Sequence, residues 1–213
     1  ADVENFKARR VEAAANGKLR GLGIANMIEH SGGGFAEQAE IRFDPSGSVK
    51  LLVGTKDQGQ SHETMYTIML SDMLGLDSDD IMVIDDDTDQ ISFGSGTIGS
   101  RSAMIGGAAL RGAADRIIAK GLSIAAHLLE AGESDIEFAD GVFAIVGTDR
   151  SLTITEIAMA SFKPAQLPEG MAPGLIESGT FAPKQDTFPN GSHVCEVEID
   201  PATGEVEILN YSV

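Results

Sequence analysis

Apolar and polar residues alternate along the first part of the chain, which is the pattern of strands that bury one face. Residues 21–30 and 38–53 are predicted as strands, and the second of these turns back on itself at residues 44–47, Asp-Pro-Ser-Gly. A short apolar run at residues 81–84 predicts one more strand, buried on both faces. The alternating positions of the 38–53 segment are Ile41, Phe43, Val49, Leu51 and Val53.

Three other segments have helical spacing. Residues 4–16 predict a short helix that ends near Gly17, and residues 102–131 predict a long one. Residues 61–75 predict the other main helix, with Ser61 as its expected N-cap. Its apolar positions are Met65, Ile68, Met69 and Met73.

The remaining pattern completes an α+β fold of mixed β-sheet hairpins with two main helices. Residues 135–158 predict a small hairpin that turns at Asp140-Gly141, followed by a short helix from about Thr153. Residues 162–190 are rich in proline and are predicted as an extended connection without a regular element.

An internal similarity divides the chain. Residues 39–52 and 195–209 both read as strand, Asp-Pro turn and strand, which fits either a true repeat or the coincidence of two common hairpins. The first copy leads into a polar loop and a helix, whereas the second stops shortly before the last residue, Val213. We therefore expect the chain to be an internal part of a longer polypeptide.

This organisation suggests that residues 1–213 form a partial binding region in three segments. Residues 21–131 would form a first strand-hairpin, loop and helix unit, and residues 132–190 a small hairpin with a proline-rich connection. Residues 191–213 would begin a second, truncated unit.

Composition describes an ordinary globular protein, with 42% apolar residues and a mean hydropathy of +0.01. No apolar run approaches the roughly 20 residues needed to span a bilayer, and the N-terminal residues lack the pattern of a signal peptide. The sequence thus predicts a cytoplasmic protein without membrane insertion. Its net charge of −18 argues against nucleic acid as a partner, because phosphates would be repelled.

Two features have a structural explanation that we prefer to a functional one. Asp85, Asp87 and Asp89 resemble part of a calcium loop, but the glycine and closing glutamate of such a loop are missing. A solvated acidic edge explains them better. Cys195 is the single cysteine, so neither a disulfide nor a Cys-x-x-Cys metal site is expected, and a buried strand thiol is the preferred interpretation.

Two polar, glycine-containing loops each lead directly into a predicted helix. We call residues 54–64 the first loop and residues 94–102 the second loop. Helix starts offer unpaired N–H groups and a partial positive charge, which suits an anionic ligand. The two loops together could hold one large anion from two sides.

The first loop contains groups that bind and position rather than react. Gln58 and Gln60 flank Gly59, and each carboxamide offers a donor and an acceptor that can bind a heterocycle edge or an oxo group. His62 could be a base or a metal ligand, but the other histidines give no ligand spacing with it. A structural hydrogen bond from His62 is therefore the preferred interpretation.

The second loop formally matches the dinucleotide fingerprint, with glycines at 94, 96 and 99. A nicotinamide site is disfavoured, because these glycines do not directly follow a strand and no acidic residue follows at the required distance. Ser100 and Ser102 place hydroxyls at a helix start. Arg101 could form a surface ion pair or the counter-charge of a phosphate, and the flanking serines and glycines favour the phosphate.

At these loops the chain resembles the large, molybdopterin-binding subunit of the xanthine oxidase family of molybdenum hydroxylases, in its carbon monoxide dehydrogenase and aldehyde dehydrogenase large-chain type. The resemblance covers nearly the whole chain. Its motifs are Gly54-Thr55, Gln58 to Thr64, Gly94 to Thr97, Gly99 to Ser102, Gly106-Gly107, Gly21 to Ile24, and Pro189 to His193 with Glu196 to Asp200.

The resemblance implies a cofactor, a reaction and partners. Molybdopterin cytosine dinucleotide with molybdenum would be the cofactor, and an oxygen derived from water would be inserted into a small-molecule substrate. Electrons would leave through iron–sulfur and FAD subunits or domains. The cofactor contacts would fall on Gln58, Gly59, Gln60, Ser61, His62, Gly99, Ser100, Arg101 and Ser102.

The same resemblance places the catalytic glutamate of the family beyond Val213. No catalytic residue and no metal ligand is therefore expected within the chain, which alone would be inactive.

Two alternatives remain open. The chain could belong to a non-catalytic paralogue or scaffold module of the same fold, or to a nucleotide-binding enzyme. The substrate also stays open among carbon monoxide, an aldehyde, a purine and another heterocycle.

Overall fold

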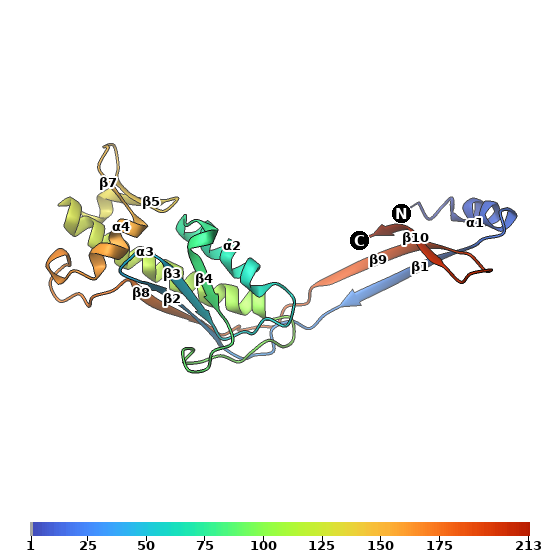
Figure 1. Cartoon of the computed structure of the whole chain (residues 1–213), viewed down its shortest axis with the longest axis horizontal. Helices are drawn as coiled ribbons and strands as arrows, with labels where there is room; N and C mark the ends of the chain where they lie inside the picture. Colours follow the sequence, from blue (N-terminus) through green and yellow to red (C-terminus); the bar gives the residue numbers. More distant parts are fainter. Residues whose placement is uncertain (1) are drawn as a thin grey trace. The chain divides into compact units, whose positions relative to one another are not determined.

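A computed structural model describes residues 2–213, and the chain forms two compact units. Unit 1 contains the chain up to Ser31 together with Thr187–Val213, and unit 2 contains Gly32–Asp186 (Figure 1). These units divide the chain differently from the three predicted segments, because the first strand pairs with a strand near the C-terminus. Among residues 2–213 there is no helix both long and apolar enough to cross a membrane.

Unit 1 is a three-stranded antiparallel sheet with one helix. Its strands lie in the order β1-β9-β10, and Arg9 of the helix bonds to Glu196 of the central strand at 2.9 and 2.6 Å. Cys195 is half-buried on that strand, at the predicted strand position but not in a core. The elements are α1 (Phe6–Ala15), β1 (Leu19–Ile28), β9 (Asn190–Ile199) and β10 (Val206–Ser212).

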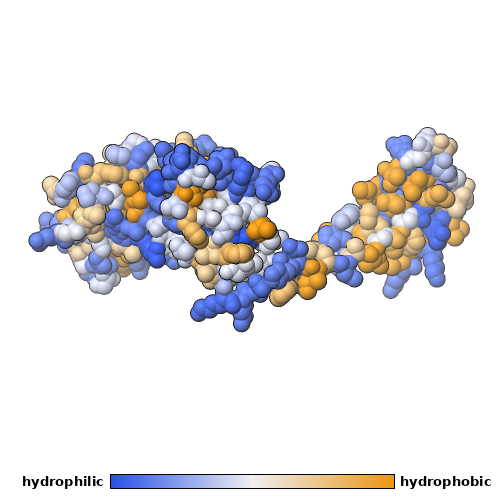
Figure 2. All heavy atoms as spheres, turned by 90° about the horizontal axis from the view of Figure 1, so that it is seen from below, coloured by the Kyte–Doolittle hydropathy of each residue, from blue (hydrophilic) through white to orange (hydrophobic). Residues whose placement is uncertain are grey.

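The two faces of this sheet differ in polarity. Glu196 and Glu198 lie on the face that α1 covers, where they pair with Arg9 and Arg20. The register brings apolar residues together on the opposite face, where they are exposed, and Figure 2 shows this apolar surface over the unit that carries β1, β9 and β10. Its most exposed members are Leu19, Met27, Val206, Ile208 and Tyr211.

Unit 2 is built on a four-stranded sheet in the order β4-β3-β2-β8, in which only β3 and β4 run parallel. The predicted 38–53 segment forms β2 and β3, with the predicted turn between them. The prediction that residues 162–190 contain no regular element is wrong, because β8 lies within them and pairs along β2. The strands are β2 (Glu37–Phe43), β3 (Val49–Val53), β4 (Ile81–Ile84) and β8 (Ile176–Phe181).

The helices of unit 2 pack on this sheet and bury its apolar positions. The predicted helices at 61–75 and 102–131 are confirmed as α2 (His62–Leu74) and α3 (Gly107–Leu129), and α3 is preceded by a π-helical turn at Ser102–Gly106. The core lies between them and the sheet, and includes Ile41, Phe43, Leu51, Leu70, Leu110 and Ile117.

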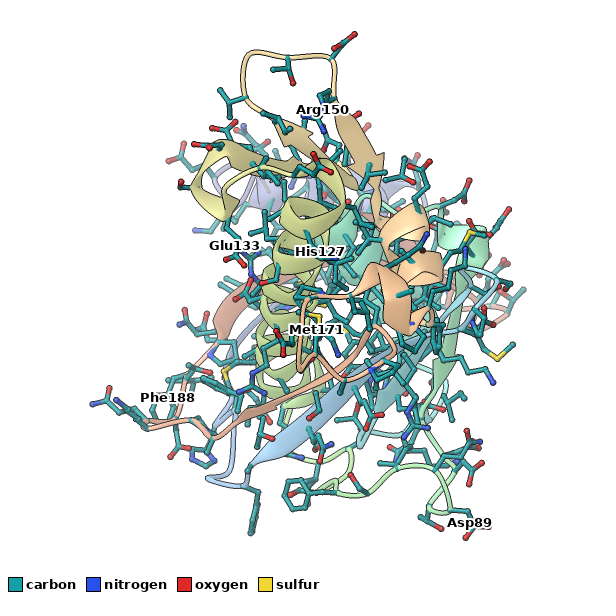
Figure 3. The ribbon with its side chains drawn as sticks, turned by 90° about the vertical axis from the view of Figure 1, so that its left-hand side faces the viewer. Asp89, His127, Glu133, Arg150, Met171 and Phe188 are labelled. Atoms are coloured by element: carbon teal, nitrogen blue, oxygen red, sulfur yellow. The ribbon has the colours of Figure 1, made fainter. Side chains whose placement is uncertain are left out.

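The hairpin predicted within residues 135–158 forms, and a third strand extends it to a small sheet that packs against α3. Figure 3 shows this hairpin, with Arg150, at the opposite end of unit 2 from the acidic loop that carries Asp89. The helix α4 that follows has a capping box between Thr153 and Glu156. The elements are β5 (Ile136–Ala139), β6 (Val142–Ile145), β7 (Ser151–Thr153), α4 (Ile154–Ser161), and 3₁₀ turns at Ser78–Asp80, Glu133–Asp135 and Pro164–Gln166.

The α+β class is thus confirmed, and the two similar hairpins turn in the same way. In β2–β3, Oδ1 of Asp44 accepts the N–H of Ser46 at 2.7 Å; in β9–β10, Oδ1 of Asp200 accepts the N–H of Ala202 at 2.8 Å. Each aspartate therefore stabilises its own turn through the N–H two residues on, which explains the aspartate at the start of both turns.

The contact between β8 and α3 gives a first prediction. A Cβ at Gly179 would overlap the carbonyl oxygen of Ala109 and the backbone nitrogen of Ala113. We expect Gly179→Ala to lower the free energy of unfolding by about 1–3 kcal/mol, as overpacking in a core does. Gly23→Ala is the matched control, since a Cβ at that strand glycine meets nothing within 4 Å. Urea unfolding compares the two; equal effects would contradict the close packing.

Candidate cofactor site

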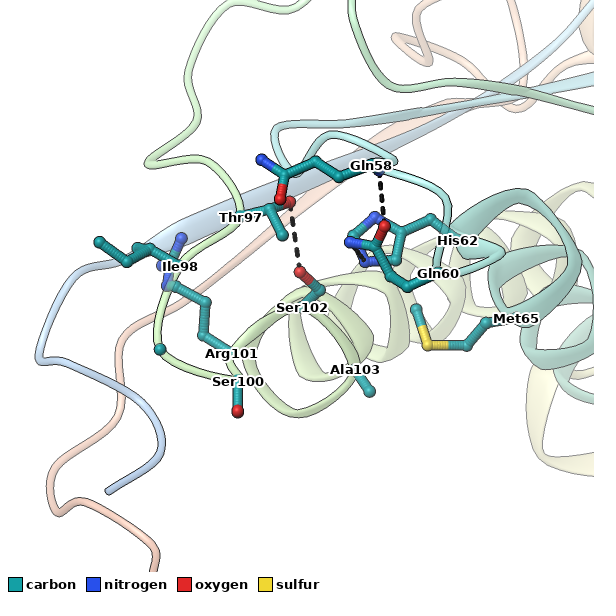
Figure 4. A pocket seen from close by; sticks show the side chains of 11 residues that line it. Gln58, Gln60, His62, Met65, Thr97, Ile98, Ser100, Arg101, Ser102 and Ala103 are labelled. Carbon is teal, nitrogen blue, oxygen red and sulfur yellow. Dashed lines mark hydrogen bonds between the residues drawn. The ribbon is translucent and has the colours of Figure 1, made fainter. Parts of the chain in front are cut away.

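The first and second loops line one cavity of about 400 Å³ in unit 2 (Figure 4). Seven of the nine predicted site residues line it; Gly59 and Ser61 lie between lining residues in the chain but do not line it. The structure thus brings the two predicted loops together. The lining residues are Gln58, Gln60, His62, Met65, Thr97, Ile98, Gly99, Ser100, Arg101, Ser102 and Ala103.

Asp57, which the sequence analysis did not single out, organises the first loop. Its carboxylate accepts the backbone N–H groups of Gly59 at 2.6 Å, Gln60 at 3.0 Å and His62 at 2.9 Å. These bonds, that from Gly59 first, hold the pKa of Asp57 below its ordinary value. The same contacts cap the start of α2.

Ser61 does not cap α2, contrary to the prediction. Its backbone has a φ of 64°, in the left-handed region, and its side chain makes no capping bond. An N-cap serine needs an extended backbone to direct its hydroxyl at the following N–H groups, and the left-handed turn prevents this. The carboxylate of Asp57, four residues before Ser61, caps the helix instead by accepting the N–H of His62.

Gln60 and His62 form a hydrogen-bonded pair at the cavity. The Oε1 atom of Gln60 accepts the backbone N–H of Gln58 at 2.5 Å, so its Nε2 atom must donate to Nε2 of His62, which lies at 3.0 Å. The histidine proton then belongs on Nδ1. That atom is buried and has no hydrogen-bond partner within residues 2–213.

His62 thus makes the structural bond that the sequence favoured. The ring is only 3% exposed and packs edge-on against Tyr66. The described part of the chain contains no group of three or more His, Cys, Asp or Glu residues that could hold a metal ion.

Tyr66 connects α2 to both loops, a role that its sequence position alone did not reveal. Its hydroxyl donates to the carbonyl of Ser102 at 3.0 Å, so the Thr55 hydroxyl, at 2.7 Å, must donate to it. Burial raises the pKa of Tyr66 to about 12, which keeps this proton in place. A Cβ at Gly106 would overlap the tyrosine hydroxyl, so the small residue there is required.

Thr97 joins the two loops directly. Its hydroxyl accepts the N–H of Lys56 at 2.8 Å and donates to the carbonyl of the same residue at 2.7 Å. Ser102 lies 3.4 Å from this hydroxyl. Hydrogen bonds of Thr97 therefore hold the first and second loops together at the cavity.

Arg101 does not form the surface ion pair considered from the sequence, because its side chain is buried. It is 1% exposed, and Nη1 donates to Glu37 at 2.6 Å and to the Gly96 carbonyl at 2.8 Å. Nη2 donates to the carbonyls of Phe35 at 2.9 Å and Ala36 at 3.1 Å. Both terminal nitrogens are thus saturated by protein acceptors, whereas Nε is buried without a hydrogen-bond partner among residues 2–213. Figure 4 shows the side chain directed away from Gln60.

Glu37 is a further residue that sequence reasoning missed, although a signal existed. It occupies the same buried face of β2 as Ala39, Ile41 and Phe43, and it is 0% exposed. A carboxylate at a core position requires a cationic partner. Extending the alternation two residues toward the N-terminus would have revealed it.

The cavity suits an anionic ligand in an otherwise acidic chain. Neither Asp nor Glu is among the described residues that line it. Gly59 and Gly99 have positive φ values of 100° and 58°, and a Cβ at either would meet nothing within 4 Å. Gly99 lines the cavity, so a ligand can approach its backbone closely. The helical turn that starts at Ser102 adds N–H groups without an intrahelical partner, as every helix start does.

Comparison with known proteins places these features in a family. A sequence profile described as the molybdopterin cofactor-binding domain matches residues 1–213. The carbon monoxide dehydrogenase large chain of Hydrogenophaga pseudoflava is 38% identical over 90% of this chain and 24% of its own length. The nicotine 6-hydroxylase large subunit of Paenarthrobacter nicotinovorans is 35% identical over 100% of this chain and 28% of its own length.

Solved structures show the same fold. A crystal structure of the Cu,Mo-CO dehydrogenase has a TM-score of 0.83 and 35% identity, covering 99% of this chain and 29% of that chain. Quinoline 2-oxidoreductase from Pseudomonas putida 86 has a TM-score of 0.81 and 30% identity, covering 98% and 28%. The chain thus spans about a quarter of the length of the relatives it matches.

The Asp57 contacts predict a pH-dependent first loop. Since the folded-state pKa of Asp57 is lowered, its stabilisation is present above the ordinary carboxyl pKa and is lost as pH falls through the lower value. We expect Asp57→Asn to speed amide hydrogen exchange at Gly59, Gln60 and His62 at neutral pH. Exchange in the unsubstituted protein, corrected for intrinsic rates, should accelerate only in acid.

Asp77→Asn is the control for this prediction, because the carboxylate of Asp77 accepts the N–H of Asp79 within a separate turn and does not contact the first loop. Unchanged exchange in the first loop of the Asp57 variant would show that the carboxylate does not hold it.

Proposed function

The chain belongs to the molybdopterin cofactor-binding domain family, and from this we propose that its cavity holds part of molybdopterin cytosine dinucleotide in a molybdenum-dependent oxidoreductase. The observation that carries the proposal is the shared cavity of the two loops, which contains no carboxylate. A volume of about 400 Å³ suits a portion of such a ligand.

The residues of the cavity fit a cofactor that is both anionic and rich in hydrogen-bonding edges. The buried Nδ1–H of His62 has no partner in the described chain, and polar atoms left in this state are expected to bond to something else. The exposed backbone at Gly59 and Gly99 allows close approach. Gly99 lines the cavity, so its open backbone supports a bound group between the loops.

Gln60 is the residue we assign to the pterin and oxo end of the cofactor. Its carboxamide uses one N–H and one lone pair within the protein, which leaves one of each for a ligand. Gln58 and His62 orient it, while Gly59 and Ser61 shape the turn that carries it.

The second loop would bind the phosphate region. Gly99, Ser100 and Ser102 would contribute backbone N–H groups and hydroxyls. Arg101 would contribute through its backbone and through the shape of the loop, since its side chain is committed to Glu37. When bound, the cofactor supplies a molybdenum centre for two-electron oxidation, and the chain binds and orients it.

The intact protein would oxidise a small molecule and pass electrons to iron–sulfur and FAD subunits or domains. Relatives named as carbon monoxide dehydrogenase and nicotine 6-hydroxylase support an oxidoreductase of this kind, though they differ in substrate. The cytoplasmic setting remains a prediction from the sequence. None of the residues of this chain is assigned a catalytic role.

Gln60→Ala in the intact protein tests the proposal. We expect molybdenum-dependent activity to fall by about 10²-fold or more, since a preorganised hydrogen-bond donor near the reacting centre is lost. The free energy of unfolding should change by about 1 kcal/mol or less, because Gln60 is exposed. Gln90→Ala is the matched control; it removes an exposed glutamine that bonds only to Asp87.

Parallel losses of activity and stability in the Gln60 variant would contradict the assignment. Metal and pterin analysis of the unsubstituted protein addresses the alternative function. A folded protein without molybdenum and pterin would identify a non-catalytic scaffold, whereas tight binding of NAD or ATP in calorimetry would identify a nucleotide enzyme.

A further inference from the structure

Glu37 and Arg101 form an ion pair that is completely enclosed by the protein. Their side chains are 0% and 1% exposed, and Nη1 lies 2.6 Å from Oε2. Such a pair contributes little net stability, because removing both charges from water offsets their attraction. Apolar residues of similar volume often serve a core equally well. The position of the pair therefore calls for another explanation.

Hydrogen bonds around this ion pair attach the second loop to the start of β2. The carboxylate of Glu37 accepts the N–H of Ser95 at 3.3 and 3.2 Å, and Arg101 donates to the Gly96 carbonyl at 2.8 Å. The Ser95 hydroxyl donates to the Ala36 carbonyl at 2.8 Å. Both ends of the segment 95–101 are thus fixed to one buried group.

The base of the first loop rests on the same pair. Gly54 donates its N–H to the Gln38 carbonyl at 3.3 Å, and a Cβ at Gly54 would overlap both Oε1 of Glu37 and Cα of Gly94. The two loops therefore approach each other over the carboxylate of Glu37. No other charged side chain that the structure describes as buried is linked to both loops.

We propose that Glu37 and Arg101 are positioning residues that hold the second loop in its cofactor-binding shape before the cofactor arrives. This inference rests on the proposed function. A loop with three glycines loses much conformational freedom when it is ordered, and fixing it in advance removes that cost from binding. Four acceptors surround the two terminal nitrogens of the planar Arg101 guanidinium, an arrangement that the single ammonium of lysine cannot reproduce.

The test uses the intact protein with the double substitution Glu37→Met and Arg101→Met. Replacing both charges avoids leaving one of them buried without a partner. In cofactor-free protein we expect amide exchange of residues 94–102 to rise about tenfold or more while exchange in α3 stays unchanged. Pterin and molybdenum content of the purified protein should fall by about tenfold. The urea midpoint should stay close to that of the control.

The control is the double substitution Arg111→Met and Asp115→Met, which removes an ion pair on the exposed surface of α3. Arg101→Lys is the conservative variant, and it should lose loop protection and cofactor content although it keeps the charge. It also preserves the test if the double variant does not fold.

The inference would be overturned if the double variant or Arg101→Lys kept the pterin and molybdenum content of the unsubstituted protein and residues 94–102 stayed protected from amide exchange. An equal rise of exchange in the loop and in α3 would also overturn it, since the pair would then act on the whole core. If the unsubstituted and control proteins lack pterin and molybdenum, the proposed function fails instead, and the exchange measurement alone decides the role of the pair.

Discussion

The architecture of the site depends on one constraint: a carboxylate at a core position of β2 must be neutralised within the protein. Glu37 has no access to water, so Arg101 has to be drawn inward from a loop far along the chain. This brings the segment that precedes α3 against the sheet. The first loop then meets the second over the same carboxylate, because Gly54 leaves no side chain between them. The cavity is a consequence of this meeting.

Polar groups complete the arrangement at the two sides of the cavity. Asp57 collects three N–H groups of the first loop, and the Tyr66 hydroxyl, kept protonated by burial, holds the start of the π-helical turn. Each of these groups acts on backbone atoms rather than on a ligand. The lining side chains are thereby left with unused hydrogen-bonding capacity, as at Gln60 and at the Nδ1 atom of His62.

Sequence patterns predicted the elements whose apolar faces are local and continuous. The alternation at Ile41 and Phe43 identified β2, and helical spacing identified α2 and α3. The strand β8 was missed because Gly179 has no side chain there, and its place is set by close packing against α3. In the site, the two loops were found because both precede helices. The alternation of β2 could have identified Glu37 as a buried carboxylate, but not its pairing with Arg101, because the two residues lie 64 positions apart in the chain.

The neutralised arginine determines how an anion could be held in this cavity. With a net charge of −18, the chain as a whole repels an anionic ligand at long range. Because the guanidinium of Arg101 is paired with Glu37, it adds little net charge to oppose that repulsion. Attraction must then come from oriented N–H groups and hydroxyls at short range, whose strength depends on their geometry. A site of this kind functions only if its loops are already in place, so the binding of the ligand and the rigidity of the second loop depend on the same buried contacts.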